Sequence, residues 1–305
     1  MTRMREELLE STDLHNDADN EHNLFEPVEE EKVEIEDTAN AYQLFMKGEE
    51  LRNATHQSEL LQNLRYKNAI QYYDRALSIC KEASTSALIL NNKGWCFAQL
   101  KRSKEALDCY KKGIIIQDDF KQLFKNILQL ELLNNIDCND VISFFDNLLI
   151  IKPPNSLILE TQGYLHLQLS QIESALKCFE NAILLNKSAL NSALGKCICL
   201  ILTGKSEDAF NYFKLIADKE KDRLHIIERI DETLPIICKI LGIGIDCKVL
   251  DFFNNIVDDL LLKNNSAFNK IQPKINHIKA EIFLHKREYI RCINETSVLT
   301  LSGEE

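Results

Sequence analysis

The sequence predicts an all-α protein built from stacked, antiparallel pairs of helices. Glycine and proline are scarce, with nine and five in 305 residues, whereas a sheet would need many more turns. Hydrophobic residues make up 45% of the chain, which is enough for a continuous core. A small residue and an aromatic residue recur about every 34 residues, and such a period is typical of a unit of two helices.

The recurring unit is clearest in three segments of the chain. Each segment has a small residue, then an alanine twelve positions later, then an aromatic residue four positions further on. These residues are Gly94, Ala106 and Tyr110; Gly163, Ala175 and Phe179; and Cys197, Ala209 and Phe213. Val141 and Phe145 continue the frame between the first two sets, and Gln129 takes the small place there.

A first, longer unit precedes these segments. Gly48 and Ala69 stand at its small places and Tyr73 at its aromatic place, but Gly48 and Ala69 are further apart than in the other units. We therefore expect an insertion near residues 52–65.

The small residues indicate where two helices approach closely, because close contact requires Gly or Ala where ridges meet grooves. The aromatic residues then fill the space between units. Ser103 and Ser206 stand three residues before an alanine, and we expect them to cap the second helices. Pro153 and Pro154 predict the end of one unit, because proline cannot continue a helix.

These segments resemble tetratricopeptide repeats, whose signature has Gly or Ala at the eighth place, Ala at the twentieth and an aromatic residue at the twenty-fourth. The units lie at about 41–83, 87–120, 122–155, 156–189 and 190–223, of which 122–155 matches least well. The resemblance implies a right-handed superhelix of stacked helix pairs, an α-solenoid, over residues 38–223. Residues 224–305 keep amphipathic runs but lose the phase, so we expect divergent helical repeats and a C-terminal cap.

The acidic charge of the chain lies in its N-terminal tail. Residues 1–37 contain 14 acidic and three basic residues, so they account for the formal net charge of −11. This composition predicts a disordered, solubilising segment. The alternative is that residues 24–36, which mix apolar and acidic side chains, dock in the binding groove. The balanced body argues against nucleic acid as a partner, because phosphate binding needs clustered Lys and Arg.

Export, membrane insertion and catalysis are not indicated. The ten cysteines form no Cys-x-x-Cys pair, so we interpret them as core residues in a reducing compartment, the cytoplasm or the nucleus. No apolar stretch approaches the roughly 20 residues that span a bilayer. We expect no cofactor and no metal, since Gly242 and Gly244 lack a third glycine and Asp17, Asp19 and Glu21 lack the glycine of a calcium loop.

The remaining functional surface is the groove that the resemblance implies along the first helices of successive units. By the frame of the family its residues are Asn91, Asn92, Trp95 and Gln99, then Glu160, Tyr164 and Gln168, then Lys196. Trp95 and Tyr164 take equivalent places, and aromatics beside amides suit an extended peptide or a helix of a partner. The alternative for both aromatics is packing between helices.

We therefore predict a protein-interaction adaptor or scaffold, not an enzyme, that binds a peptide or helix of a protein partner in this groove. The alternative is a structural or regulatory subunit of a multiprotein complex, buried through its C-terminal helices. A third hypothesis is a cochaperone that grips the C-terminal carboxylate of Hsp70 or Hsp90 with Lys, Arg and Asn. Only Asn92 matches that clamp well, because Phe45 and Glu49 stand at the first-repeat places. The sequence indicates no oligomeric state.

Overall fold

The computed structural model describes residues 40–134, 137–187, 189–219, 223–241, 247–262 and 268–285. These ranges form thirteen α-helices and contain no β-strand. The acidic tail predicted over residues 1–37 lies outside the described residues.

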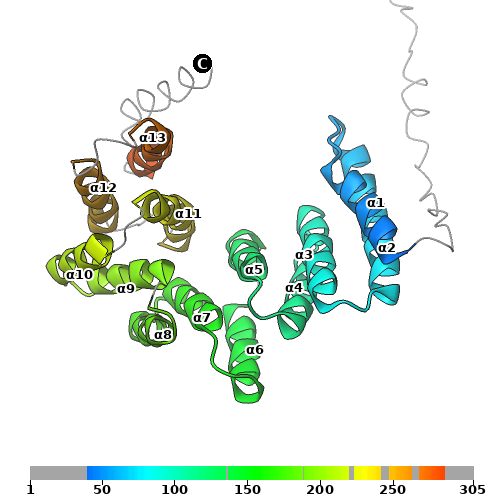
Figure 1. Ribbon diagram of the computed structural model, residues 1–305, viewed down its shortest axis with the longest axis horizontal. Coiled ribbons are helices and arrows are strands. Elements are labelled where there is room, and N and C mark those ends of the chain that lie inside the picture. Colours follow the sequence, from blue (N-terminus) through cyan, green and yellow to red (C-terminus); the bar gives the residue numbers. More distant parts are fainter. Residues whose placement is uncertain are drawn as a thin grey trace, which may run out of the picture. The chain divides into compact units, whose positions relative to one another are not determined.

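The helices follow one another in pairs along the chain (Figure 1). In order they are α1 (Ala41–Asn53), α2 (Glu59–Ile79), α3 (Ala83–Gln99), α4 (Ser103–Ile116), α5 (Lys121–Asn134), α6 (Cys138–Ile151), α7 (Ser156–Gln168), α8 (Ile172–Leu185), α9 (Leu190–Leu202), α10 (Ser206–Lys219), α11 (Arg223–Leu241), α12 (Cys247–Leu262) and α13 (Phe268–His285). The members of α1 and α2, α3 and α4, α7 and α8, and α9 and α10 pack against each other. Phe124 of α5 stacks on Phe145 of α6 with ring centroids 5.9 Å apart. The predicted all-α solenoid of helix pairs is confirmed.

The close approach of paired helices depends on glycine. A methyl group added at Gly94 would lie 2.5 Å from the ring of Tyr110, and one at Gly163 would lie 2.6 Å from the ring of Phe179. Phe179 also meets Gly195 of the following unit, so its ring is enclosed by glycines from both sides. The small and aromatic places of the repeat are therefore direct contact partners.

Local sequence sets the end of one unit and the start of the next. Pro153 and Pro154 lie between α6 and α7. The Asn155 side chain caps α7 by accepting a backbone hydrogen bond of 2.8 Å.

One expectation about local structure needs correction. Ser103 is the first residue of α4 rather than its cap, because Arg102 holds the N-cap place and makes no side-chain hydrogen bond there. Ser206 is likewise the first residue of α10. Gln129 stands at the small place of α5 but is exposed, so α5 does not use that place for a close helix contact.

The first unit differs from the others where the sequence predicts an insertion. Helix α1 ends at Asn53, and α2 begins at Glu59 and runs for 21 residues, longer than the other second helices.

Helix α11 begins the part of the chain in which the repeat phase is lost. It packs against α5, α7 and α9, and also against α13. Its buried residues Ile226, Ile230, Leu234 and Ile237 recur at helical spacing, so one apolar face drives this packing. Helix α11 thus packs beside the first helices α5, α7 and α9.

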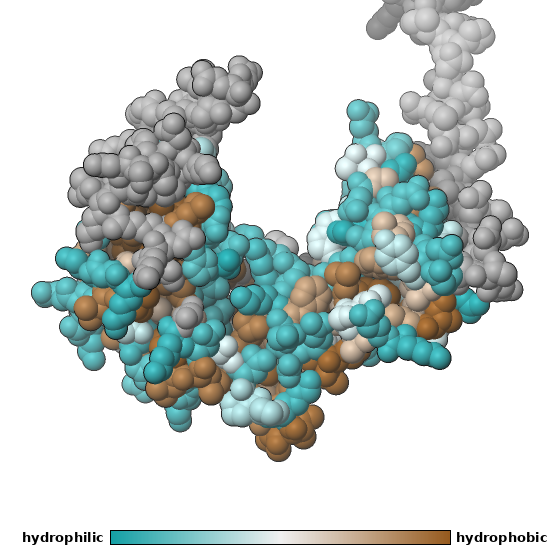
Figure 2. Space-filling model, in the orientation of Figure 1, coloured by the Kyte–Doolittle hydropathy of each residue, from teal (hydrophilic) through white to brown (hydrophobic). Residues whose placement is uncertain are grey.

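Three of the second helices end in pairs of exposed apolar residues. These pairs are Ile115 and Ile116 of α4, Ile150 and Ile151 of α6, and Leu184 and Leu185 of α8. Hydrophobic surface is visible at the end of α6 in the space-filling view (Figure 2). The pairs recur with the repeat period, so they occupy the same place in three successive units.

Candidate functional site

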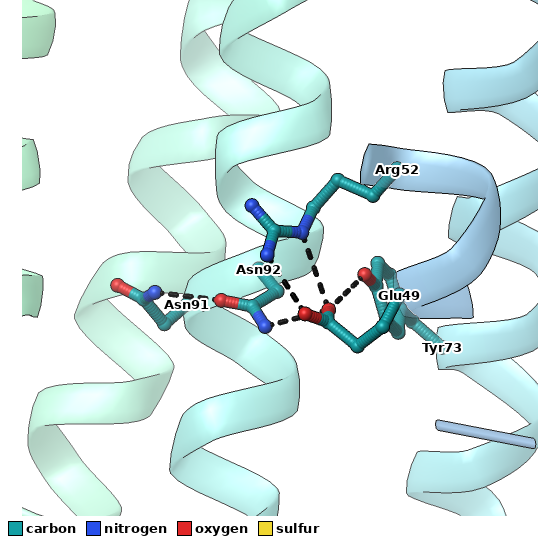
Figure 3. A network of polar contacts seen from close by, with 5 residues as sticks. All are labelled: Glu49, Arg52, Tyr73, Asn91 and Asn92. Atoms are coloured by element: carbon teal, nitrogen blue, oxygen red, sulfur yellow. Dashed lines mark hydrogen bonds and ion pairs between the residues drawn. The ribbon is translucent and has the colours of Figure 1, made fainter. Parts of the chain in front are cut away.

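A connected set of polar side chains joins α1, α2 and α3 (Figure 3). The Glu49 carboxylate accepts hydrogen bonds from Arg52 Nη2 at 2.7 Å, from the Tyr73 hydroxyl, and from Asn92 Nδ2 at 2.7 Å. Asn91 Nδ2 donates to Asn92 Oδ1 over 2.9 Å. Because Asn91 and Asn92 are buried, these bonds satisfy amide groups that would be costly to leave unpaired.

The chain of amides continues into α5. Asn126 Nδ2 donates to Asn91 Oδ1 over 2.8 Å, and Gln122 Nε2 donates to Asn126 Oδ1 over 2.8 Å. Every amide therefore donates in the direction of Glu49. A carboxylate can only accept, so Glu49 fixes the orientation of the whole series. We call Glu49, Asn92, Asn91, Asn126 and Gln122 the amide chain.

The environment of Glu49 favours its ionised form. Burial acts to raise its pKa, but hydrogen bonds from Arg52, Tyr73 and Asn92 and the charge of Arg52 outweigh burial and lower the pKa below the ordinary 4.5. The carboxylate is thus held as an anion by its own neighbours.

Trp95 is half-buried beside the amide chain. The guanidinium of Arg52 lies over its ring, with Cζ 5.3 Å from the centroid, and Tyr66 meets it edge-on at 5.5 Å. These contacts come from α1 and α2, so packing between helices accounts for much of the Trp95 surface.

A pocket of about 450 Å³ lies between α5, α7, the start of α9, and α11. Its polar and charged lining includes Lys121 and Lys125 of α5, Glu160 of α7, Asn191 of α9, and His225, Arg229 and Glu232 of α11. Apolar side chains complete it, among them Phe124, Leu157 and Ile236. Gln122 lies at its lining as well, so the amide chain ends at this pocket.

Two predicted groove residues, Glu160 and Tyr164, line this pocket. The two oxygens of Glu160 accept from Ser192 Oγ at 2.7 Å and Asn191 Nδ2 at 3.3 Å. Burial raises the pKa of Glu160, and these hydrogen bonds with the charges of Lys121 and Arg229 only partly oppose it. The pKa of Glu160 is therefore raised, whereas the pKa of Glu49 is lowered.

Tyr164 is buried, and its ring packs edge-on against Phe179 with centroids 5.0 Å apart. Its hydroxyl donates to the Asn191 carbonyl over 3.0 Å. Burial raises the pKa of Tyr164 well above its ordinary value. Tyr164 therefore supports the pocket wall and offers little free surface to a ligand.

The other predicted residues do not join these two clusters. Gln99 is exposed near the end of α3, and Gln168 is half-buried at the end of α7, outside the pocket lining. Lys196 forms an ion pair of 2.8 Å with Glu180 of α8 and lies over the ring of Tyr212 of α10. Its side chain thus faces second helices, away from the pocket.

Several residues of the two clusters were not predicted from the sequence. Asn126 stands 35 residues after Asn91, so the repeat period alone could have paired them. Lys125 lies in the poorly matching unit and Lys121 directly precedes it, and Arg229 lies in α11, where no repeat frame assigns it a place.

The described residues offer neither a cluster of metal ligands nor a helix that could span a membrane. Among them, no group of three or more His, Cys, Asp or Glu side chains could hold a metal ion. No described helix is both long and apolar enough to cross a membrane.

Residues 60–117, which span α2 to α4, match the model of the family described as tetratricopeptide repeat. No curated protein matches the chain.

Solved structures of tetratricopeptide repeat proteins are similar to the chain at low identity. A tetratricopeptide repeat protein from Parabacteroides merdae is 15% identical, with a TM-score of 0.43, over 87% of this chain and 94% of that one. Yeast Tom70 is 14% identical, with a TM-score of 0.39, over 88% of this chain and 61% of that one. YrrB, described as a tetratricopeptide repeat protein with an unusual peptide-binding site, is 17% identical, with a TM-score of 0.35, over 62% of this chain and 94% of that one. At such scores these likenesses carry no argument about function.

The family match falls on the helices whose small and aromatic places form the contacts described above. Residues 60–117 are therefore similar to the tetratricopeptide repeat family, as the repeated residues of this segment predict.

Proposed function

We propose that the protein is an interaction scaffold that binds a segment of a partner protein in the pocket between α5, α7, α9 and α11. The pocket carries this proposal, because it is concave, mixes apolar walls with a few charged groups, and lies along successive first helices. The proposed function requires no catalysis.

The region around Asn91, Asn92 and Trp95 is the weaker candidate for the binding surface. The amides there bond one another and Glu49, so few donors and acceptors remain for a ligand. Asn92, the residue that best matches the cochaperone clamp, donates to the Glu49 carboxylate of the chain itself. An incoming carboxylate would meet that negative charge, which argues against the clamp hypothesis.

The test is to fill the pocket without changing the rest of the surface. Ser156 is half-buried, begins α7 and lines the pocket, whereas Ser206 is half-buried, begins α10 and does not line it. Partners would be captured on wild-type protein, Ser156→Trp and Ser206→Trp, and quantified by mass spectrometry. We expect the Ser156→Trp variant alone to lose them.

Folding of each variant is checked by circular dichroism before capture. Partners retained by a folded Ser156→Trp variant would place the binding surface elsewhere. Repeating the capture with Trp95→Ala would then decide whether the first units bind instead.

A second candidate function is that of a subunit of a larger complex. The exposed apolar pairs at the ends of α4, α6 and α8 favour it, because burying these side chains against another protein would remove apolar surface from water. Size-exclusion chromatography separates the two functions. A stable monomer supports the scaffold, whereas aggregation that only co-expression relieves supports the subunit.

A further inference from the structure

The ends of three first helices meet at the pocket. Its lining includes the first turn of α5 at Lys121, the first turn of α7 at Ser156, and Ala189 and Leu190 at the start of α9. The N-terminus of a helix carries unpaired N–H groups and the positive end of the helix dipole. Ala189 makes no side-chain cap for α9, so this helix start is available to an anion.

Positively charged side chains surround the same space. Lys121 and Lys125 reach it from α5, and neither forms an ion pair with another described residue. Arg229 reaches it from α11 and pairs with Glu232 through Nη1 at 2.7 Å. Its Nε atom is buried and has no hydrogen-bond partner among the described residues, which is costly unless a ligand supplies an acceptor.

The two acidic residues of the pocket are already engaged. Glu160 accepts from Ser192 and Asn191, and Glu232 accepts from Arg229. Arg229 offsets the charge of Glu232, and Glu160 is held by neutral donors, while Lys121 and Lys125 remain to attract a ligand. Leu157 and Ile236 add apolar surface beside these cations.

Resting on the proposed function, we propose that this pocket recognises an acidic segment of its partner, in which carboxylate side chains alternate with apolar ones. The carboxylates lie toward Lys121, Lys125, Arg229 and the start of α9, and the apolar side chains lie on Leu157 and Ile236. The chemistry that selects the partner is thus negative charge next to apolar surface.

The test measures fluorescence anisotropy of three short labelled peptides with the full chain. In the first peptide glutamate alternates with leucine, and in the other two glutamine or lysine replaces the glutamate. We expect the glutamate peptide to bind at least about tenfold more tightly than the glutamine peptide, since charge-assisted bonds are roughly twice as strong as neutral ones. Added salt should weaken binding of the glutamate peptide and leave binding of the glutamine peptide nearly unchanged.

Two substitutions of equal charge locate the site. Lys121→Glu reverses a charge at the pocket, and Lys177→Glu reverses an exposed charge on α8 that does not line it. We expect Lys121→Glu to lower the affinity for the glutamate peptide about tenfold or more. Lys177→Glu should change this affinity less than about twofold.

Equal binding of the glutamate and glutamine peptides, tighter binding of the lysine peptide, or equal effects of the two substitutions would overturn the proposal. Failure of this proposal can be told apart from failure of the proposed function. If Ser156→Trp abolishes partner capture but the glutamate peptide is not preferred, the pocket binds a partner of different chemistry. If Ser156→Trp changes nothing, the scaffold proposal fails at this pocket.

Discussion

Two half-buried glutamates on first helices, Glu49 of α1 and Glu160 of α7, have opposite electrostatic environments. Glu49 is held by Arg52, Tyr73 and Asn92, and its pKa is lowered. Glu160 accepts hydrogen bonds from Ser192 and Asn191, no cation among the described residues is paired with it, and its pKa is raised by burial. The same fold thus places one carboxylate in a satisfied structural network and another at the wall of a pocket. Completed polar networks stabilise, whereas incompletely compensated ones mark candidate binding sites.

In both regions a glycine of the first helix packs against an aromatic ring of the second. Replacing this glycine should have the largest effect on the free energy of unfolding. Gly94→Val would bring its Cβ within 2.5 Å of the Tyr110 ring, and Gly163→Val within 2.6 Å of the Phe179 ring, so both clash. We expect each to lower the free energy of unfolding by about 3 kcal/mol, and by similar amounts, as measured by urea denaturation. Gln129→Val is the matched control, because Gln129 holds the equivalent place but is exposed, and it should change stability by less than about 0.5 kcal/mol.

The Glu49 network should show the next largest effect. Glu49→Gln leaves the Arg52 guanidinium without its anion and weakens the bonds from Tyr73 and Asn92. We expect a loss of about 2 kcal/mol in the free energy of unfolding. Glu50→Gln removes an exposed carboxylate that is paired with Lys47 at the surface, and it should have little effect. Equal effects of the two substitutions would mean that the network does not stabilise the fold.

Glu160→Gln should have the smallest effect at neutral pH, within about 1 kcal/mol, because glutamine resembles the protonated acid that burial favours. Its pH dependence sharpens the comparison. Wild-type protein should lose stability relative to Glu160→Gln as pH rises from 4.5 through the raised pKa. Wild-type protein should be more stable than Glu49→Gln above pH 4.5. This difference in stability should disappear as the pH falls through the lowered pKa of Glu49. Thermal unfolding across this range measures both differences, and slopes of the same sign would contradict the assignment.

The sequence was sufficient to predict the fold because the contacts that specify it are local and repeated. Gly94 meets Tyr110 and Gly163 meets Phe179 at the same spacing, so a pattern of small and aromatic residues identifies the helix pairs.

The candidate site was less predictable because it combines residues without a common frame. Asn92 was identified, but its partner Glu49 comes from a unit with an insertion, and Arg229 comes from α11, where the phase is lost. Lys196 stands two residues after the equivalent of Glu160, and about 100° of rotation per residue turns it toward α8 and α10.

The amide chain has a further consequence because it runs from Glu49 to the edge of the pocket at Gln122. Its amide dipoles are aligned head to tail, and the carboxylate at one end sets their direction. Replacing Glu49 by glutamine removes that polarity, so the series can also run in reverse. Gln122 would then present the opposite hydrogen-bonding group to the pocket without any movement of the helices between them.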